Sequence, residues 1–205
     1  MRKRLDLDRP VERQVVVDCL ETAFQAPNGS NQQRWGWVCV DDAATRQAMA
    51  DIYRDGLAAH LALPPTQRGQ QAEGGYAVDD RQEFIGASVA YLIEHMQDVP
   101  VLVVPTIDGR FEGASIFDQA SRWGSILPAV WSFMLALRSQ GLGSAWTTLS
   151  LHREREMAEL LGIPYDRATQ AGLFPVAYTI GADFRAASRA ASGDAIHWNH
   201  WNSEG

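Results

Sequence analysis

The sequence has little cysteine, because Cys19 and Cys39 are the only two among 205 residues. A disulfide-rich secreted domain needs more cysteines than this, so that class of protein is excluded. Both residues lie in segments with apolar periodicity. This pattern favours buried free thiols in a reducing compartment over a disulfide between the two.

The chain also lacks long hydrophobic runs and an excess of positive charge. No apolar stretch reaches the ~18 residues that a membrane-spanning helix needs. Residues 1–9 are largely charged, so we expect no signal peptide and a cytoplasmic protein. The 18 lysines and arginines are outnumbered by 25 acidic residues, giving a net charge of -7. Nothing supplies a broad basic face, which argues against nucleic-acid binding.

Several catalytic and metal-binding motifs are missing. The sequence contains no Ser-His-Asp signature, zinc-ligand spacing, P-loop, or Gly-x-Gly-x-x-Gly after a strand. His197 and His200 stand three residues apart without a cysteine or carboxylate cluster, so we expect no metal site there. The aromatic tail around them is better explained as an anchor on a partner subunit. The sequence shows no obvious set of residues for acid–base catalysis, which fits an enzyme whose cofactor carries out the chemistry.

The chain is long and apolar enough for one domain, which we expect to span residues 1–205. Its hydrophobic content is 46%. Apolar periodicity predicts helices and buried strands in alternation. The expected helices cover residues 10–25, 43–61, 81–97, 115–140 and 152–161, and the expected strands cover 35–40, 99–107, 144–149 and 171–181.

One polar stretch stands out at residues 26–35, which read Ala-Pro-Asn-Gly-Ser-Asn-Gln-Gln-Arg-Trp. Pro27, Asn28 and Gly29 are turn formers. Four uncharged hydrogen-bonding side chains then follow in a row, between a helix and a strand. Such a loop can direct donors and acceptors at a planar ligand, although simple exposure to solvent would also explain its polarity.

The pattern Ala-Pro-x-Gly-x-Asn-x-Gln-x-Trp after a first long helix resembles the FMN-dependent nitroreductase family. Two positions depart from the family pattern: Arg34 replaces a usual proline, and Asn28 replaces a common serine. Later segments strengthen the resemblance. They are the Gly-Leu-Gly turn at 141–143 after a long buried helix, and the strand at 171–181 with basic residues after it.

This resemblance implies an α+β fold with a mostly antiparallel central sheet flanked by helices. It also implies a homodimer that exchanges C-terminal tails and binds FMN at the subunit interface. The helix at 115–140 is apolar over more than one stripe, so we expect it to form the dimer seam.

The resemblance further implies which residues hold FMN. The ring would be held by the loop, Arg2 would lie near the N1/O2 edge, and Arg189 would meet the phosphate. The loop residues concerned are Pro27, Asn28, Gly29, Ser30, Asn31 and Gln33, and the strand end at Thr147, Thr148 and Leu149 would face N5. Ordinary alternatives stay open, since the threonines suit any strand end and Arg189 could be a solvated tail residue.

Two segments leave further questions. Loop 64–79 is rich in Gln, Gly and Pro and is either a lid over the substrate or disordered. The family's basic N-terminal motif would begin before Met1. Either the natural start lies upstream, or the phosphate is held more weakly here.

The implied activity is an FMN-dependent oxidoreductase with two half-reactions. NADH or NADPH reduces the flavin, and an electron-poor small molecule such as a nitroarene or quinone is then reduced. The sequence does not identify the nicotinamide or the acceptor. The alternatives are a dehalogenase-like or flavin-fragmenting enzyme of similar build, or a non-enzymatic flavin-binding protein.

Overall fold

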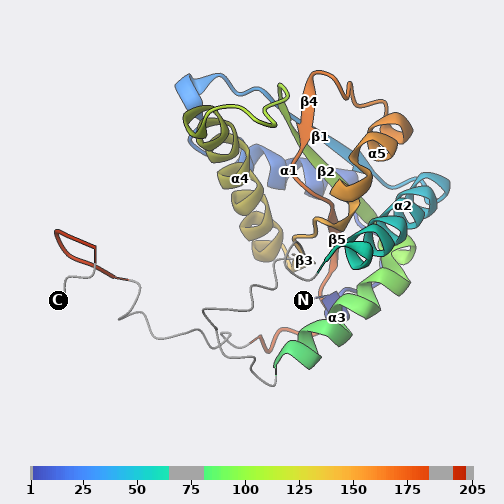
Figure 1. Ribbon diagram of the computed structural model, residues 1–205. Coiled ribbons are helices and arrows are strands. Elements are labelled where there is room, and N and C mark those ends of the chain that lie inside the picture. Colours follow the sequence, from blue (N-terminus) through green and yellow to red (C-terminus); the bar gives the residue numbers. More distant parts are fainter. Residues whose placement is uncertain (1, 65–80, 185–195, 202–205) are drawn as a thin grey trace.

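A computed structural model describes residues 2–64, 81–184 and 196–201 of the chain. Figure 1 shows helices packed on both sides of a sheet. The strands are β1 (Trp35–Val40), β2 (Val101–Asp108), β3 (Leu142–Ser144), β4 (Ala168–Gln170) and β5 (Phe174–Tyr178). The α-helices are α1 (Arg13–Ala23), α2 (Ala43–Ala62), α3 (Arg81–His95), α4 (Ile116–Ser139) and α5 (Glu154–Leu161). Short 3-10 turns are η1 (Arg2–Arg4), η2 (Gly29–Asn31), η4 (Met96–Asp98) and η5 (Leu149–Arg153).

The sheet is antiparallel at every strand pairing in the described part of the chain. Its strands follow the order β1-β2-β5-β3, and the short strand β4 pairs with the far end of β2. The register places Trp35 opposite Ile107 and Val40 opposite Leu102. The expected α+β fold with a mostly antiparallel sheet is therefore confirmed.

Strand β2 is buried over seven of its eight residues. Successive side chains of a strand point to opposite faces. Val101, Val103 and Ile107 accordingly join one apolar cluster with α1 and α4. Leu102 and Val104 join the other cluster, with α2 and α5. One strand thus anchors two hydrophobic layers, as its nearly continuous apolar sequence predicts.

Helix α4 is the longest helix of the described part and begins at a serine cap. The Ser115 hydroxyl accepts the backbone N–H of Asp118, which satisfies one of the open donors of the first turn. One side of α4 is buried against the sheet and α1. On the other side Trp131 and Leu135 are more than half exposed. No described helix is long and apolar enough to cross a membrane.

Several predicted boundaries were wrong. The expected strand at 144–149 is β3, which ends at Ser144, whereas Leu149 already begins η5. Thr147 keeps only an isolated bridge to Leu173. Next to that bridge, Gly172 has φ 134° and its backbone lies against the Thr147 carbonyl, so regular pairing cannot continue. The three-residue strand β4 is too short for a periodic signal and was not predicted.

The first and last predicted elements are also shorter than expected. Helix α1 begins at Arg13 rather than at residue 10, because Glu12 has an extended backbone. The strand predicted at 171–181 is regular only over β5. Residues 65–79 of the expected lid or disordered loop lie outside the described residues, as does Arg189.

The two cysteines are both free, as predicted, but they differ in burial. Cys19 is buried in α1, whereas Cys39 is exposed, which corrects the expectation that both are buried. The reason is that Cys39 lies on β1, at the edge of the sheet. Enough protein still surrounds its sulfur that burial, with a smaller contribution from the charge of Asp41, raises the pKa of the thiol to about 11.

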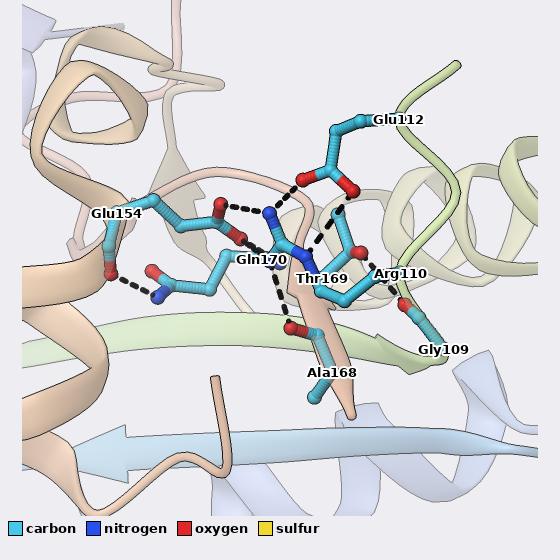
Figure 2. A network of polar contacts seen from close by, with 7 residues as sticks. All are labelled: Gly109, Arg110, Glu112, Glu154, Ala168, Thr169 and Gln170. Carbon is cyan, nitrogen blue, oxygen red and sulfur yellow. Dashed lines mark hydrogen bonds and ion pairs between the residues drawn. The ribbon is translucent and has the colours of Figure 1, made fainter. Parts of the chain in front are cut away.

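A polar network joins the end of β2 to α5 and β4 (Figure 2). Arg110 forms a two-pronged ion pair with Glu154 at 2.8 and 2.9 Å and also donates to the Ala168 carbonyl. Glu112 is a second carboxylate partner of Arg110. Burial is the largest single effect and disfavours the charged guanidinium, but the hydrogen bonds and charge of Glu154, with a smaller contribution from Tyr165, together raise the pKa of Arg110.

Glu154 also holds β4, because its carboxylate accepts the backbone N–H of Gln170 at 2.9 Å. The side chains of Arg110 and Glu154 are only 19% and 14% exposed. Loss of Glu154 would therefore leave the mostly buried Arg110 with only the exposed Glu112 as a carboxylate partner. We assign this network a structural role, which is to fix the turn after β2 against α5.

This role predicts that Glu154→Gln lowers the free energy of unfolding by about 3 kcal/mol, since a mostly buried pair is broken. Glu156→Gln is the matched control on the same helix. Its partner Arg153 and Glu156 itself are both about 40% exposed, so the change should cost roughly 0.5 kcal/mol or less. Urea unfolding measures both, and equal losses would contradict the structural role.

Candidate functional site

The polar loop predicted from the sequence packs against the N-terminal half of α4. In Figure 1 its turn η2, in light blue, lies beside the start of that helix. The Gly29 N–H donates to the Ser125 hydroxyl at 2.9 Å, and this hydroxyl donates to the Ser121 carbonyl at 2.7 Å. A Cβ at Gly29 would lie 3.3 Å from the same Ser125 oxygen. The glycine therefore permits a close approach of loop and helix.

The loop has an unusual backbone. Ser30, Asn31 and Gln33 have φ angles of 52°, 51° and 50°, in the left-handed region that non-glycine residues rarely adopt. Such conformations persist where the surrounding structure enforces them, and they gather at binding and catalytic sites. Three of them within four residues mark this loop as a candidate functional site.

Side chains of the loop support this shape. The Asn28 Oδ1 atom accepts the Gln33 backbone N–H at 2.9 Å. The Gln33 amide in turn donates to the Asn31 Oδ1 atom at 3.0 Å. The asparagine-rich sequence is suited to this arrangement, because short amide side chains bond to nearby backbone and tolerate positive φ. Local hydrogen bonds thus hold the exposed loop in one conformation.

A hollow of about 220 Å³ lies between the loop and α4. It is smaller than the roughly 300–1,000 Å³ of a typical ligand pocket, so it holds part of a ligand rather than all of a large one. Its lining residues are Asn28, Gly29, Ser30, Gln32, Gln33, Arg34, Ile107, Phe117, Ser121, Arg122 and Ser125.

Four of the predicted ring-binding residues, Asn28, Gly29, Ser30 and Gln33, line this hollow together. Pro27 and Asn31 belong to the same loop but are not among its lining residues. Sequence reasoning missed Arg122 as a site residue. For Arg34 the sequence offered one signal, which is that this arginine departs from the family pattern by replacing the usual proline.

The predicted residues at 147–149 lie elsewhere, beside α2. The Thr147 hydroxyl is buried and donates to the Leu173 carbonyl at 2.5 Å, so it serves the fold. Thr148 is exposed, and Leu149 is partly buried. Gly56 of α2 lies so close to the Leu149 carbonyl that a Cβ there would collide with it. This contact fixes where η5 begins.

The N-terminal turn η1 lies near the opposite end of α4. Arg4 Nε donates to the Ile180 carbonyl at 2.9 Å. The guanidinium groups of Arg4 and Arg138 both contact the Phe184 ring, at 4.1 and 3.9 Å. Arg2 belongs to η1, but its side chain is outside the described part, and Arg189 is not described at all.

These positions separate the predicted site into distant parts. Ser125 touches the polar loop, and Arg138 marks the region of η1. The helix rises 1.5 Å per residue, so the two lie roughly 20 Å apart along α4. Within one chain, the loop and η1 therefore lie too far apart to contact the same flavin ring.

The α+β fold and the strained polar loop together define a class of protein. Comparison of the sequence with known families identifies this class. The Nitroreductase family model matches residues 2–178. The chain therefore belongs to the Nitroreductase family. The 5,6-dimethylbenzimidazole synthase of Rhodospirillum rubrum is 27% identical over 145 residues, which is 68% of this chain. The match spans only 61% of that curated relative's length.

Solved structures share the fold at lower identity. A BluB-like flavoprotein from Clostridium difficile 630 gives a TM-score of 0.69 at 15% identity, covering 97% of this chain and 94% of that one. The FMN- and NADPH-dependent nitroreductase NfnB of Sphigopyxis sp. strain HMH gives 0.67 at 18% identity, covering 96% and 93%. An iodotyrosine deiodinase bound to FMN and 3-iodo-L-tyrosine gives a TM-score of 0.66 at 18% identity, covering 96% of this chain and 92% of that one. These likenesses confirm the nitroreductase-like fold.

The loop geometry predicts that Asn28→Ala weakens FMN binding by about fivefold to tenfold, since roughly 1 kcal/mol of loop ordering is lost with one hydrogen bond. Gln14→Ala is the control, because it removes another exposed amide, one that donates to Asp18 on α1. Titration of apo-protein with FMN by fluorescence measures both. Unchanged affinity in Asn28→Ala would contradict a role for the loop in FMN binding.

Proposed function

We propose that this protein is an FMN-dependent oxidoreductase that uses NADH or NADPH to reduce an electron-poor small molecule. The observation that carries the proposal is the strained loop of uncharged amides and hydroxyls beside α4. Family membership supports it, as do the FMN-dependent proteins that share the fold.

The donor set of the loop fits FMN. The isoalloxazine ring presents carbonyl oxygens and ring nitrogens along its edge, which uncharged amides and hydroxyls can match. Asn28, Ser30, Asn31 and Gln33 provide such groups, and the close Gly29–Ser125 contact keeps the backbone near the hollow. The loop would hold and orient the ring, while Arg2 and Arg189 would serve its N1/O2 edge and its phosphate.

A homodimer would complete this site. The loop and η1 lie too far apart in one chain to meet the same flavin ring. Helix α4 also exposes Trp131 and Leu135, which a second copy could cover. We therefore propose that FMN is held between two subunits, with the loop of one and the N-terminal turn of the other.

Bound FMN would supply hydride transfer, accepting a hydride from the nicotinamide and passing electrons to the acceptor. The protein's part is binding, orientation and electrostatics. The loop would fix the ring through neutral hydrogen bonds. A cation at the N1/O2 edge, the role proposed for Arg2, would favour negative charge there.

A second candidate reaction is fragmentation of the flavin. It is favoured by the 27% identity to the 5,6-dimethylbenzimidazole synthase of Rhodospirillum rubrum. The likeness to iodotyrosine deiodinase makes reductive dehalogenation a further outcome to test. These activities and a non-enzymatic flavin-binding role differ in their products, so product analysis separates them.

The proposal predicts that the purified protein is yellow and that anaerobic NADH or NADPH bleaches it. A nitroarene or quinone should then restore the colour, with the reduced product found by chromatography. Incubation with FMN, NAD(P)H and oxygen, followed by mass spectrometry for 5,6-dimethylbenzimidazole, tests the second candidate. If the protein takes up no FMN on reconstitution, both candidate reactions are contradicted.

The dimer proposal predicts that Trp131→Glu shifts the protein to a monomer and releases FMN, because a charge would be buried in the interface. Leu160→Glu is the control, since Leu160 is another exposed apolar residue and lies on α5 rather than α4. Analytical ultracentrifugation and flavin absorbance report the two effects. A wild-type monomer that retains FMN would contradict the shared site.

A further inference from the structure

The hollow beside the polar loop contains two guanidinium groups in a protein of net charge -7. Arg34 stands at the end of the loop, directly before β1, and Arg122 lies in the second turn of α4. No aspartate or glutamate is among the described residues that line the hollow. The hollow is therefore a positive spot on an acidic protein, which attracts anions.

Arg122 is held in place at this hollow. Its Nη1 atom donates to the backbone carbonyl of Asp108 at 2.7 Å. Gly109 has φ 95°, and a Cβ there would lie 3.4 Å from the guanidinium carbon of Arg122. The glycine thus leaves room for the guanidinium beside the turn after β2. The carbonyl contact uses one of five N–H donors, so others remain for a ligand.

Arg34 is held more loosely. Its carbonyl accepts the backbone N–H of Asp108 at 2.8 Å, which fixes its main chain. Its Nη1 atom lies 3.5 Å from the Asp108 carboxylate, beyond the usual hydrogen-bond distance, and both side chains are 53% exposed. Such a pair contributes little and can be exchanged for a ligand's carboxylate. Two guanidiniums and one carboxylate leave a net charge of about +1, which matches a monoanion.

The rest of the hollow suits an aromatic ring. Phe117, at the start of α4, is 78% exposed, and Ile107 provides a further apolar wall. An exposed aromatic residue beside fixed polar groups is an arrangement that orients planar ligands. The apolar wall and the two arginines can therefore contact different parts of one bound ligand.

We propose that Arg34 and Arg122 select a planar aromatic carboxylate as the substrate that receives electrons. The guanidiniums would bind the carboxylate through charge-assisted hydrogen bonds, and Phe117 would contact the ring. The inference rests on the proposed oxidoreductase function. It adds the substrate class and two specificity-determining residues.

The test compares 4-nitrobenzoate with the uncharged 4-nitrobenzamide as electron acceptors for the FMN-loaded protein. The wild type should have a higher kcat/KM for the acid. Arg122→Gln and Arg34→Gln should each reduce the acid-to-amide ratio, Arg122→Gln by about tenfold or more, as expected for one charge-assisted hydrogen bond. The reduction should appear mainly in KM for the acid, because binding is affected rather than the hydride transfer.

Arg13→Gln is the matched control. Arg13 is an exposed arginine paired with Asp41, it does not line this hollow, and its replacement changes net charge by the same amount. It should leave the acid-to-amide ratio unchanged. A wild type without preference for the acid overturns the proposal, and so does an equal loss of preference in Arg13→Gln.

Two further measurements separate this inference from the proposed function. Calorimetric titration with benzoate and benzamide needs no turnover, so tighter benzoate binding that depends on Arg122 would support the subsite even in an inactive protein. The flavin phosphate is the other anion that the hollow could bind, and comparison of FMN with riboflavin tests this alternative. Arg122→Gln should affect both flavins alike, and selective loss of FMN would show that the hollow holds the flavin phosphate and overturn the proposal.

Discussion

Burial of β2 on both faces is the constraint on which the rest of this structure depends. Its side chains alternate between two apolar clusters, so helices must cover both sides of the sheet. Helices α1 and α4 cover one face, and α2 and α5 cover the other. An exposed face on either side would leave valines and leucines in water, at a cost of about 1.5–3 kcal/mol for each side chain. The three-layer arrangement follows from that one strand.

The same constraint positions the polar loop. Because α4 lies along the sheet, its N-terminal half meets the loop at Gly29 and Ser125, while its C-terminal end lies near η1. The helix is a rigid spacer of roughly 20 Å between the two segments. Its outer face keeps apolar side chains in solvent, including Trp131 and Leu135. The separation and the exposed face are both in line with the proposed association of two copies around a shared flavin.

The end of β2 illustrates how structural and functional roles divide between neighbouring residues. Arg110 is committed to Glu154 and fixes the turn against α5 (Figure 2). Asp108 instead faces Arg34 and accepts a bond from Arg122 at its backbone carbonyl. Arg110 is mostly buried together with its partner Glu154, whereas Arg34 has only a long, solvent-exposed ion pair with Asp108. A ligand can replace the second kind of contact but not the first.

The sequence by itself determined the long elements and the polarity of the loop. Apolar periodicity located four of the five α-helices in the described part of the chain closely and identified β2 as buried on both faces, because those patterns repeat over many residues. The family resemblance supplied the antiparallel order, which periodicity does not contain. Only the tertiary structure decided that β3 ends at Ser144, that Cys39 is exposed, and that Arg122 joins Arg34 at one hollow. The physical reason is that these outcomes depend on contacts between segments far apart in the chain, which leave no local pattern in either segment.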